Sequence, residues 1–223
     1  MDNERPGSRE QQVYLGNARL PTAASGRSAL VRLLTDPGFA VRAVRYALGL
    51  PVRMATEDRR VLEQLIFPFF RDLAEVHNVL FVGCDWYTKH YQRTFFRAKN
   101  YWTLDFNPAA RRFGAAQHVQ APLEQLTRHF PAGTFDLIVC NGVYGFGLDA
   151  PAQCEAAFEQ CHLCLAPNGY FVLGWNAIPA RDPVPLAQIA ALDRFQKFTF
   201  APLGTWRYLT ETSYRHTYDF YRK

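Results

Sequence analysis

Two parts of the chain place chemically useful residues directly after or within runs of apolar residues. The run Val79–Val82 leads into Gly83, and the run at 101–106 carries Asp105, 22 residues after Gly83. An acidic side chain at this separation from a glycine turn can accept hydrogen bonds from both hydroxyls of a ribose, when the nucleoside lies over the turn. The pair therefore predicts a site for a ligand that contains a nucleoside.

The turn that begins at Gly83 departs from a glycine-rich loop. Its sequence is GCDWYT, with Asp85 and Tyr87 at the alternate positions where further glycines are usual, and Trp86 between them. Glycine lets the backbone come close to a ligand, and a dinucleotide-binding loop fits this turn least well. Three alternatives stay open. The turn still binds its nucleoside-containing cofactor, with the rings of Trp86 and Tyr87 forming one wall of the site; it has lost the ability to bind this cofactor; or it binds a different nucleotide. The acid at the next strand tip favours retained binding.

Further candidate residues follow the other apolar runs. In a parallel sheet, ligands bind beyond the carboxyl ends of the strands, near the point where the strand order reverses. The other residues expected at this edge are Cys84, Phe106, Gln120, Ala121, Asn141, Trp175 and Asn176. His90 and Tyr144 are candidate bases for a nucleophile that must lose a proton. Lys89 is a candidate partner for a ligand carboxylate.

The cysteines do not have the spacing of a metal site. Three of the five, Cys154, Cys161 and Cys164, occur close together with His162 beside them. On the helix expected there, these cysteines share one face, whereas His162 points about 100° away from Cys161. Zinc-ligand spacings are absent, and a free cysteine behaves as a small buried hydrophobic residue. We therefore expect these cysteines to pack against a sheet and expect no metal.

Strand-like runs alternate with helix-compatible stretches from residue 79 onwards. The expected strands are 79–83, 101–106, 117–120, 135–141 and 170–176, and the expected helices between them are 89–97, 108–114, 122–130 and 150–165. This alternation predicts a doubly wound α/β fold, with a mostly parallel sheet covered on both faces. A helix is expected over 184–195. The last two strands carry alternating aromatic residues and are expected to pair antiparallel at the sheet edge.

The first third of the chain has a different character. Residues 1–27 are polar and are expected to form a flexible leader, and residues 28–78 a helical region that acts as a lid. The third helix of this region begins after Thr56, and Pro68 should kink or split it. Residues 1–60 hold ten Arg and six acids, but several of these arginines alternate with apolar positions at helical spacing, which favours solvated helix faces over a nucleic-acid site.

With these elements in place, the chain resembles the class I, Rossmann-like S-adenosylmethionine-dependent methyltransferases. The resemblance covers residues 79–222 and rests on VLFVGC, YWTLDFNP, FDLIVCNGVYGFGLD and CLAPNGYFVLGWN in this order, with HTYDFYRK as a last antiparallel strand. It implies a seven-stranded sheet with an antiparallel edge strand over 79–223, preceded by the helical region. The degenerate glycine-rich first motif, with Phe81 in the place of the usual acid, is the departure.

The resemblance also implies a cofactor and an activity. S-adenosylmethionine would be held by residues 83–87, Asp105, Phe106, Gln120, Ala121 and Asn141. The stretch NGVY at 141–144 is a faint echo of the family's N-P-P-Y motif and implies roles in the reaction for Asn141 and Tyr144, with His90 as a possible base. Tyr144, Trp175, Asn176 and Trp206 would bind the acceptor.

We expect a methyltransferase that acts on a nitrogen or oxygen of a small molecule. The alternative is a catalytically silent protein of the same fold that serves as a binding or scaffold subunit. Methylation of nucleic acid is a third alternative, which rests only on the basic N-terminal region. No apolar run is long enough to span a bilayer, and the N-terminus has no signal-peptide core, so a cytoplasmic protein without a membrane partner is expected.

Overall fold

The structure is a computed structural model that describes residues 54–223, together with residues 38, 41, 44, 45, 48, 50 and 52. The chain divides into two units, Met1–Val52 and Arg53–Lys223. In the first unit, residues 38, 41, 44 and 45 are helical. The predicted leader lies outside the described residues. Residues 54–223 all belong to the second unit.

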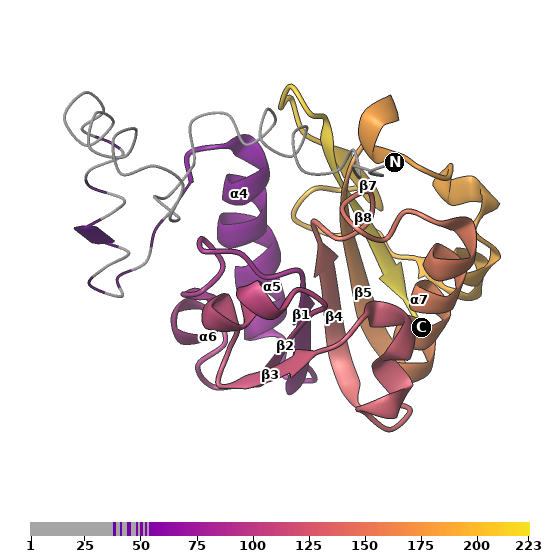
Figure 1. The fold of residues 1–223 in the computed structure, drawn as a ribbon, viewed down its shortest axis with the longest axis horizontal. Coiled ribbons are helices and arrows are strands. Elements are labelled where there is room, and N and C mark those ends of the chain that lie inside the picture. The colour runs from indigo at the N-terminus through magenta and orange to yellow at the C-terminus, as the bar shows by residue number, and fades with distance from the viewer. Residues whose placement is uncertain are drawn as a thin grey trace, which may run out of the picture. The chain divides into compact units, whose positions relative to one another are not determined.

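In the described part of the chain, an eight-stranded sheet forms the centre of this second unit (Figure 1). The strands are β1 (Asn78–Val82), β2 (Asn100–Asp105), β3 (Gln117–Gln120), β4 (Phe135–Asn141), β5 (Leu165–Asn176), β6 (Gln196–Lys197), β7 (Arg207–Leu209) and β8 (His216–Arg222). Their order is β3-β2-β1-β4-β5-β8-β6, and β7 also pairs with β8. Strands β1 to β5 are parallel, and β8 is antiparallel to β5. The predicted mostly parallel sheet is confirmed.

The antiparallel strand β8 is not the outermost one. One edge of β8 pairs with β5, and its other edge is shared by β6, which pairs with 221–222, and β7, which pairs with 217–219. The loop 198–206 separates the two short strands. The seventh position of the predicted sheet is therefore filled by two short strands instead of one.

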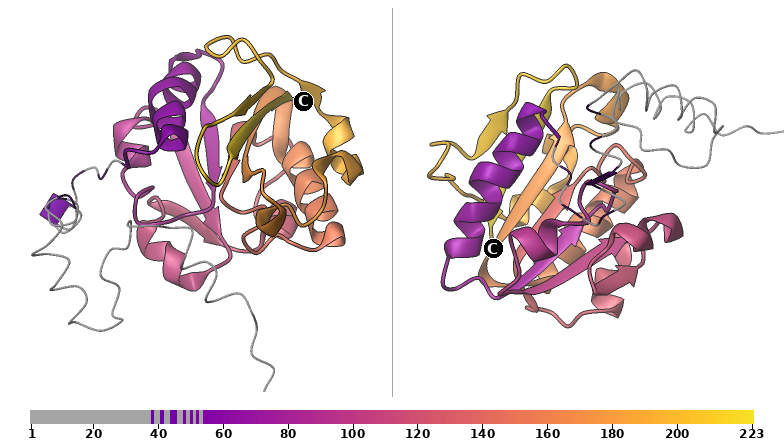
Figure 2. Two further views of the ribbon diagram at one scale, coloured as in Figure 1. Left: turned by 90° about the horizontal axis from the view of Figure 1, so that it is seen from above. Right: turned by 90° about the vertical axis from the view of Figure 1, so that its left-hand side faces the viewer.

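Helices cover both faces of the sheet (Figures 1 and 2). One face carries α4 (Glu57–Val61), the π-helical turn η1 (Leu62–Ile66), α5 (Phe67–Asp72) and α6 (Tyr91–Thr94), and the other carries α7 (Pro151–Cys164). The 3₁₀ segments are η2 (Pro108–Phe113), η3 (Leu123–Arg128), η4 (Pro179–Arg181), η5 (Leu186–Gln188) and η6 (Ala190–Arg194). None of the described helices is long and apolar enough to cross a membrane.

Several predicted helices are shorter or tighter than expected. The prediction of α-helices over 108–114, 122–130 and 184–195 was wrong, because 3₁₀ turns occupy these stretches, and α6 covers only part of 89–97. Each of the three is bounded by proline or glycine, and a short connector gains too few i→i−4 hydrogen bonds to offset the cost of starting an α-helix.

Pro68 produces an irregularity without splitting its helix. Proline lacks the N–H that would bond four residues back, and its ring collides with the carbonyl there. Here the turn before it is π-helical, so that Phe67 N donates to Leu62 O, and Pro68 lies in the first turn of α5. The helix therefore continues from Glu57 to Asp72 past the proline.

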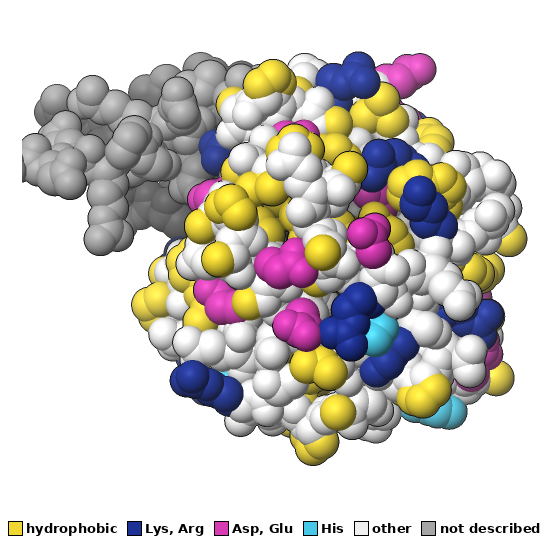
Figure 3. Space-filling view, turned by 90° about the vertical axis from the view of Figure 1, so that its right-hand side faces the viewer, with side chains coloured by type: hydrophobic (Ala, Val, Ile, Leu, Met, Phe, Trp, Pro, Cys, Tyr) yellow, Lys and Arg dark blue, Asp and Glu magenta, His cyan; other side chains and the backbone are white. Residues whose placement is uncertain are grey.

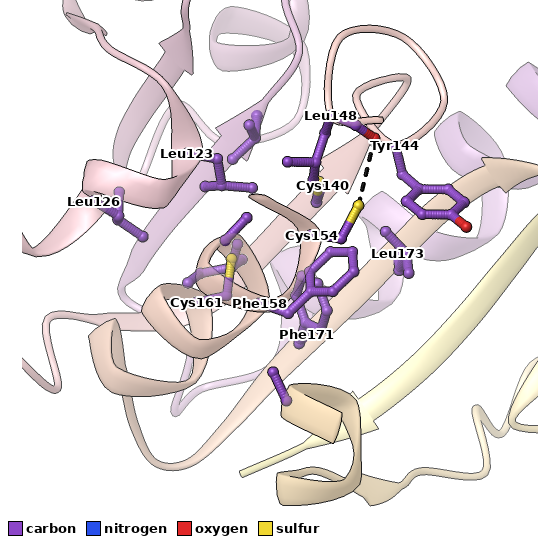
Figure 4. Close-up of a cluster of buried hydrophobic side chains, with 14 of the residues drawn as sticks. Leu123, Leu126, Cys140, Tyr144, Leu148, Cys154, Phe158, Cys161, Phe171 and Leu173 are labelled. Atoms are coloured by element: carbon purple, nitrogen blue, oxygen red, sulfur yellow. Dashed lines mark hydrogen bonds between the residues drawn. The ribbon is translucent and has the colours of Figure 1, made fainter. Parts of the chain in front are cut away.

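Strand pleating divides the core between the two faces. In β1, Leu80 and Val82 face the α7 side, whereas Val79 and Phe81 face the side of α4 and α5. The side chains of Cys140, Cys154, Cys161 and Cys164 are all fully buried in the hydrophobic cluster between α7 and the sheet, called the α7 cluster below. Figure 4 labels the first three of them. The prediction that the helix cysteines pack against the sheet is confirmed.

Candidate functional site

The tips of β1 and β4 meet at the point where the strand order reverses. Gly83 follows β1 with a φ angle of +95°, and a Cβ atom added to it would overlap the carbonyl oxygen of Asn141 and lie 2.9 Å from Val143 Cγ2. Only glycine combines this backbone angle with this close approach. The one glycine that the altered turn keeps is therefore the one that the packing of the strand tips requires.

Asp105, at the tip of β2, is bonded to the turn after β1. Its Oδ2 accepts a hydrogen bond from Cys84 N at 2.7 Å, and its Oδ1 accepts one from Asn107 N at 2.8 Å. Burial and the charge of Asp105 raise the pKa of Cys84 to about 12, so this thiol is not ionised at neutral pH. Asn107 caps the segment that follows by accepting from Ala109 N at 2.9 Å.

The residues next to Asp105 complete this side of the site. Phe106 is 54% exposed, and a Cβ atom at Gly147 would lie 3.0 Å from its ring. Gln120 ends β3 opposite Asp105 and is exposed. Ala121 N donates to the carbonyl of Asp105 at 3.2 Å. The structure thus brings the predicted residues of the first three strand tips together.

The turn from Asp85 to Thr88 is closed by its own hydrogen bonds. Asp85 Oδ1 accepts from Trp86 N at 2.7 Å, Asp85 N donates to Thr88 Oγ1 at 3.1 Å, and Thr88 N donates to Asp85 O at 2.9 Å. The rings of Trp86 and Tyr87 make an edge contact at 5.4 Å. Burial raises the pKa of Asp85, although the Trp86 N–H and the charge of Arg59 act in the opposite direction.

Lys89 lies in the turn before α6 and is exposed. Helix α6 begins at Tyr91, so Lys89 lies outside the helix, and the sequence spacing alone does not place it over the strand tips.

A buried ion pair on α4 lies against this turn. Arg59 has its Cζ 4.3 Å from the centre of the Tyr87 ring and donates to the hydroxyls of Tyr87 and Tyr91, both at 3.3 Å. Its Nε lies 3.3 Å from Asp58 Oδ2. Burial opposes the ionisation of Asp58, but the charge of Arg59 and the hydrogen bonds from Thr56 and Tyr214 act together against it, and the pKa of this carboxyl is lowered. The sequence analysis missed both residues, because EDRR has the pattern of an ordinary charged first helical turn.

Three buried polar side chains join the tips of β4, β5 and β8. His216 Nδ1 lies 2.7 Å from Asn176 Oδ1, and its Nε2 lies 3.0 Å from Asn141 Oδ1. Burial lowers the pKa of His216 to about 4, so the ring is neutral at pH 7 and can donate only one hydrogen bond. One of the two amides therefore turns its NH₂ group towards the ring. Gly174 makes room, because a Cβ atom there would overlap Asn141 Oδ1.

The two predicted bases, Tyr144 and His90, are buried. Tyr144 is fully buried, and its hydroxyl lies 2.7 Å from Asp182 Oδ1 and also contacts the backbone of Val184. Burial, together with the neighbouring carboxylate, raises the pKa of Tyr144. His90 is 4% exposed and packs against the ring of Tyr91 at 5.0 Å.

The two predicted acceptor-binding tryptophans, Trp175 and Trp206, lie elsewhere. Trp175 is in the α7 cluster, and its Nε1 donates to the fully buried Asp219 at 3.2 Å. The carbonyl of Trp206 accepts from Phe220 N in the middle of β8, and its ring lies 4.6 Å from Arg207 Cζ. The structure does not bring these rings to Gly83 and Asp105.

Comparisons with known proteins bear on this geometry. The family model described as "Methyltransferase domain" matches residues 80–173. A search of curated proteins gave no significant match. The fold is similar to that of a SAM-dependent methyltransferase from Archaeoglobus fulgidus, with a TM-score of 0.54 and 12% identity over 73% of this chain and 91% of that one.

Two further solved structures share the fold. The N-methyltransferase NodS from Bradyrhizobium japonicum WM9, in complex with S-adenosyl-L-homocysteine, gives a TM-score of 0.51 and 16% identity over 84% of this chain and 99% of that one. A TehB-like SAM-dependent methyltransferase from Corynebacterium glutamicum gives a TM-score of 0.51 and 18% identity over 74% of this chain and 93% of that one. At these identities the likeness shows the fold alone. The family model covers most of β1 to β5, the strands whose tips form the site, so this part of the chain is similar to the methyltransferase domain of that family.

Proposed function

We propose that this chain is an S-adenosylmethionine-dependent methyltransferase that acts on a nitrogen or oxygen atom of a small molecule. The observation that carries the proposal is Asn141 at the tip of β4, where the strand order reverses and where its backbone carbonyl meets Gly83. His216 bonds one end of the Asn141 side-chain amide. We infer that the other end, or the neighbouring backbone carbonyl, hydrogen-bonds the nucleophile, since an amide recognises N–H and O–H groups equally well.

The residues present fit an adenosyl cofactor. A carboxylate has about four acceptor positions, and the backbone bonds from Cys84 and Asn107 use two of those on Asp105. The two that remain suit the two hydroxyls of a ribose. The exposed ring of Phe106 adds apolar surface for a base. In this proposal Gly83, Cys84, Asp105, Phe106, Gln120 and Ala121 hold the nucleoside, and residues 85–87 lie at its other end.

When bound, S-adenosylmethionine supplies the methyl group as an electrophile. The contribution of this chain is then to orient the nucleophile, and holding reactants in attack geometry accounts for much of the rate of such displacements. Because Tyr144 and His90 are buried, we assign them structural roles and no base. The acceptor should accordingly need no base from the protein, as with a neutral amine or an acidic hydroxyl.

Calorimetry with S-adenosylmethionine and S-adenosylhomocysteine tests the cofactor site, and mass spectrometry of a panel of small amines and phenols tests the acceptor. Binding of both ligands and a product heavier by one methyl group are expected. A folded protein that binds neither ligand would favour the catalytically silent alternative.

Nucleic acid is not part of this proposal. On the face that carries α7, acidic and basic side chains are interspersed, without a large area of one sign (Figure 3). Electrostatic binding to a phosphate backbone weakens steeply with salt. Salt-sensitive binding of RNA or DNA would therefore argue against a small-molecule acceptor, and a flat response would agree with it. The cytoplasm remains the predicted location.

A further inference from the structure

We propose that two side chains, Arg59 and Asp85, together recognise the amino-acid end of the cofactor, Arg59 its carboxylate and Asp85 its ammonium. The inference rests on the proposed cofactor site at the tips of β1 and β2. It adds a contribution from α4, a helix that lies outside the residues matched by the family model.

Four backbone donors of the altered turn are already in use. Cys84 N donates to Asp105, Asp85 N to Thr88 Oγ1, Trp86 N to Asp85 Oδ1 and Thr88 N to Asp85 O. A glycine-rich turn can offer such N–H groups to an anionic ligand. Since most of these N–H groups are bonded within the protein, a ligand carboxylate needs donors from a side chain.

Among the described residues, Arg59 is the cation best placed to supply these donors. It is 8% exposed and its guanidinium stacks on Tyr87, the residue that replaces the last glycine of the turn. Its contacts with Asp58, Tyr87 and Tyr91 use three of its five N–H groups. A planar guanidinium with two donors left suits a carboxylate.

Other cations near the turn are less suited to this role. Lys89 is exposed and precedes α6. Arg112 influences the charge of Asp85, but it is exposed, lies on η2 after β2, and has its Cζ 4.6 Å from the ring of Phe113. It therefore lacks the buried position against the turn that Arg59 has.

Asp85 has the complementary properties. Its carboxylate is half-buried next to Trp86 N, and it feels the charge of Arg59. The ion pair made by Arg59 is with Asp58, and among the described contacts none joins Arg59 to Asp85. Two opposite charges that are close but not bonded to each other match a zwitterion, whose ammonium and carboxylate are carried on one carbon atom. Burial makes an unpaired carboxylate costly, so a bound cation is favoured.

Three adenosyl thioethers that lack the sulfonium charge allow the carboxylate contact of Arg59 and the ammonium contact of Asp85 to be measured separately. S-adenosylhomocysteine carries ammonium and carboxylate, 5′-(3-aminopropylthio)-5′-deoxyadenosine carries the ammonium alone, and 5′-methylthioadenosine carries neither. In the wild-type protein, calorimetry should rank their affinities in this order. Arg59→Gln should remove the higher affinity for S-adenosylhomocysteine over the aminopropyl thioether. Asp85→Asn should remove the higher affinity for the aminopropyl thioether over 5′-methylthioadenosine. Each affinity ratio should change by about tenfold or more.

The third ligand also monitors the fold, since its affinity depends on the nucleoside half of the site. Arg59→Lys should keep part of the first advantage. The control Arg71→Gln, which removes an exposed arginine on α5 that pairs with Asp72, should leave all three ratios as they are. Unchanged ratios in Arg59→Gln and Asp85→Asn, with 5′-methylthioadenosine still bound, would overturn this inference and leave the proposed function standing. If the wild-type protein bound none of the three ligands, the proposal of a cofactor site would be wrong, and so would the roles assigned to Arg59 and Asp85.

Discussion

The most direct test of the cofactor site is Asp105→Ala. Two hydrogen bonds from a ribose to this carboxylate would be charge-assisted, each with a net contribution of about 1.5–3 kcal/mol. Asp105 is only half-buried, so water replaces part of this loss. We expect cofactor affinity to fall by about tenfold to a hundredfold, which corresponds to about 1.4–2.8 kcal/mol, measured by calorimetry with S-adenosylhomocysteine.

The same change should also lower the stability of the ligand-free protein. The Asp105 carboxylate supports the backbone as well as the predicted ribose site, because it accepts from Cys84 N and Asn107 N at 2.7 and 2.8 Å. Losing both bonds should cost about 1–2 kcal/mol. For a domain of this size that lowers the melting temperature by about 2–8 °C.

Asp136→Ala provides a matched control for the fold. Asp136 Oδ2 accepts from His77 N and Asn78 N at 2.9 and 2.8 Å, so it also holds two backbone N–H groups, but at the opposite ends of the strands. This variant should lose similar stability and keep its affinity for the cofactor. Equal affinity in Asp105→Ala and the wild-type protein would show that the acid at the tip of β2 only supports the backbone.

Three further changes test other parts of the site. Gly174→Ala places a methyl group against Asn141 Oδ1 and should lower the free energy of unfolding in urea by about 1–3 kcal/mol; an unchanged midpoint would contradict the packing described. The double change of Asp85 and Tyr87 to glycine should weaken cofactor binding in calorimetry, because it removes side-chain contacts and adds backbone freedom, whereas tighter binding would indicate a decayed site. The pKa of His216 is lowered from its ordinary value of 6.5 to about 4 in the folded chain, so the unfolded chain takes up a proton first and stability is lost as the pH falls from about 6.5 to 4. Urea unfolding of the His216→Gln variant at pH 7 and pH 5 should show roughly 1–2 kcal/mol less of this loss, and an identical pH dependence would mean that the histidine is not buried neutral.

Much of the sheet and the nucleoside side of the site follow from local patterns. Strands β1, β2, β4 and β5 each contain a run of mainly apolar residues between turn signals, and the spacing of Gly83 and Asp105 places an acid next to the glycine turn in this parallel pair. The cap Asn107 is followed directly by proline, which is a feature of the sequence itself. These inferences need only neighbouring residues and the geometry of a strand.

The remaining site residues depend on contacts between distant parts of the chain. Arg59 meets Tyr87 because a helix that precedes the sheet packs beside the first turn, and His216 meets Asn141 because of the register in which β8 pairs with β5. Pleating explains the misplaced tryptophan: Trp175 and Asn176 are adjacent, so their side chains leave the strand on opposite faces. No spacing in the sequence carries this information.

The four thiols buried under α7 can be used to measure how often this part of the chain opens. Cys140, Cys154, Cys161 and Cys164 have no exposed surface, so an alkylating reagent reaches them only when α7 separates from the sheet or the whole chain unfolds. The rate at which mass spectrometry detects each labelled thiol in native buffer then measures the free energy of that opening, site by site. Cys84, half-buried beside Asp105, lies outside this cluster. Its labelling in the presence and absence of ligand would follow occupancy of the strand tips, while the other four follow the integrity of the core.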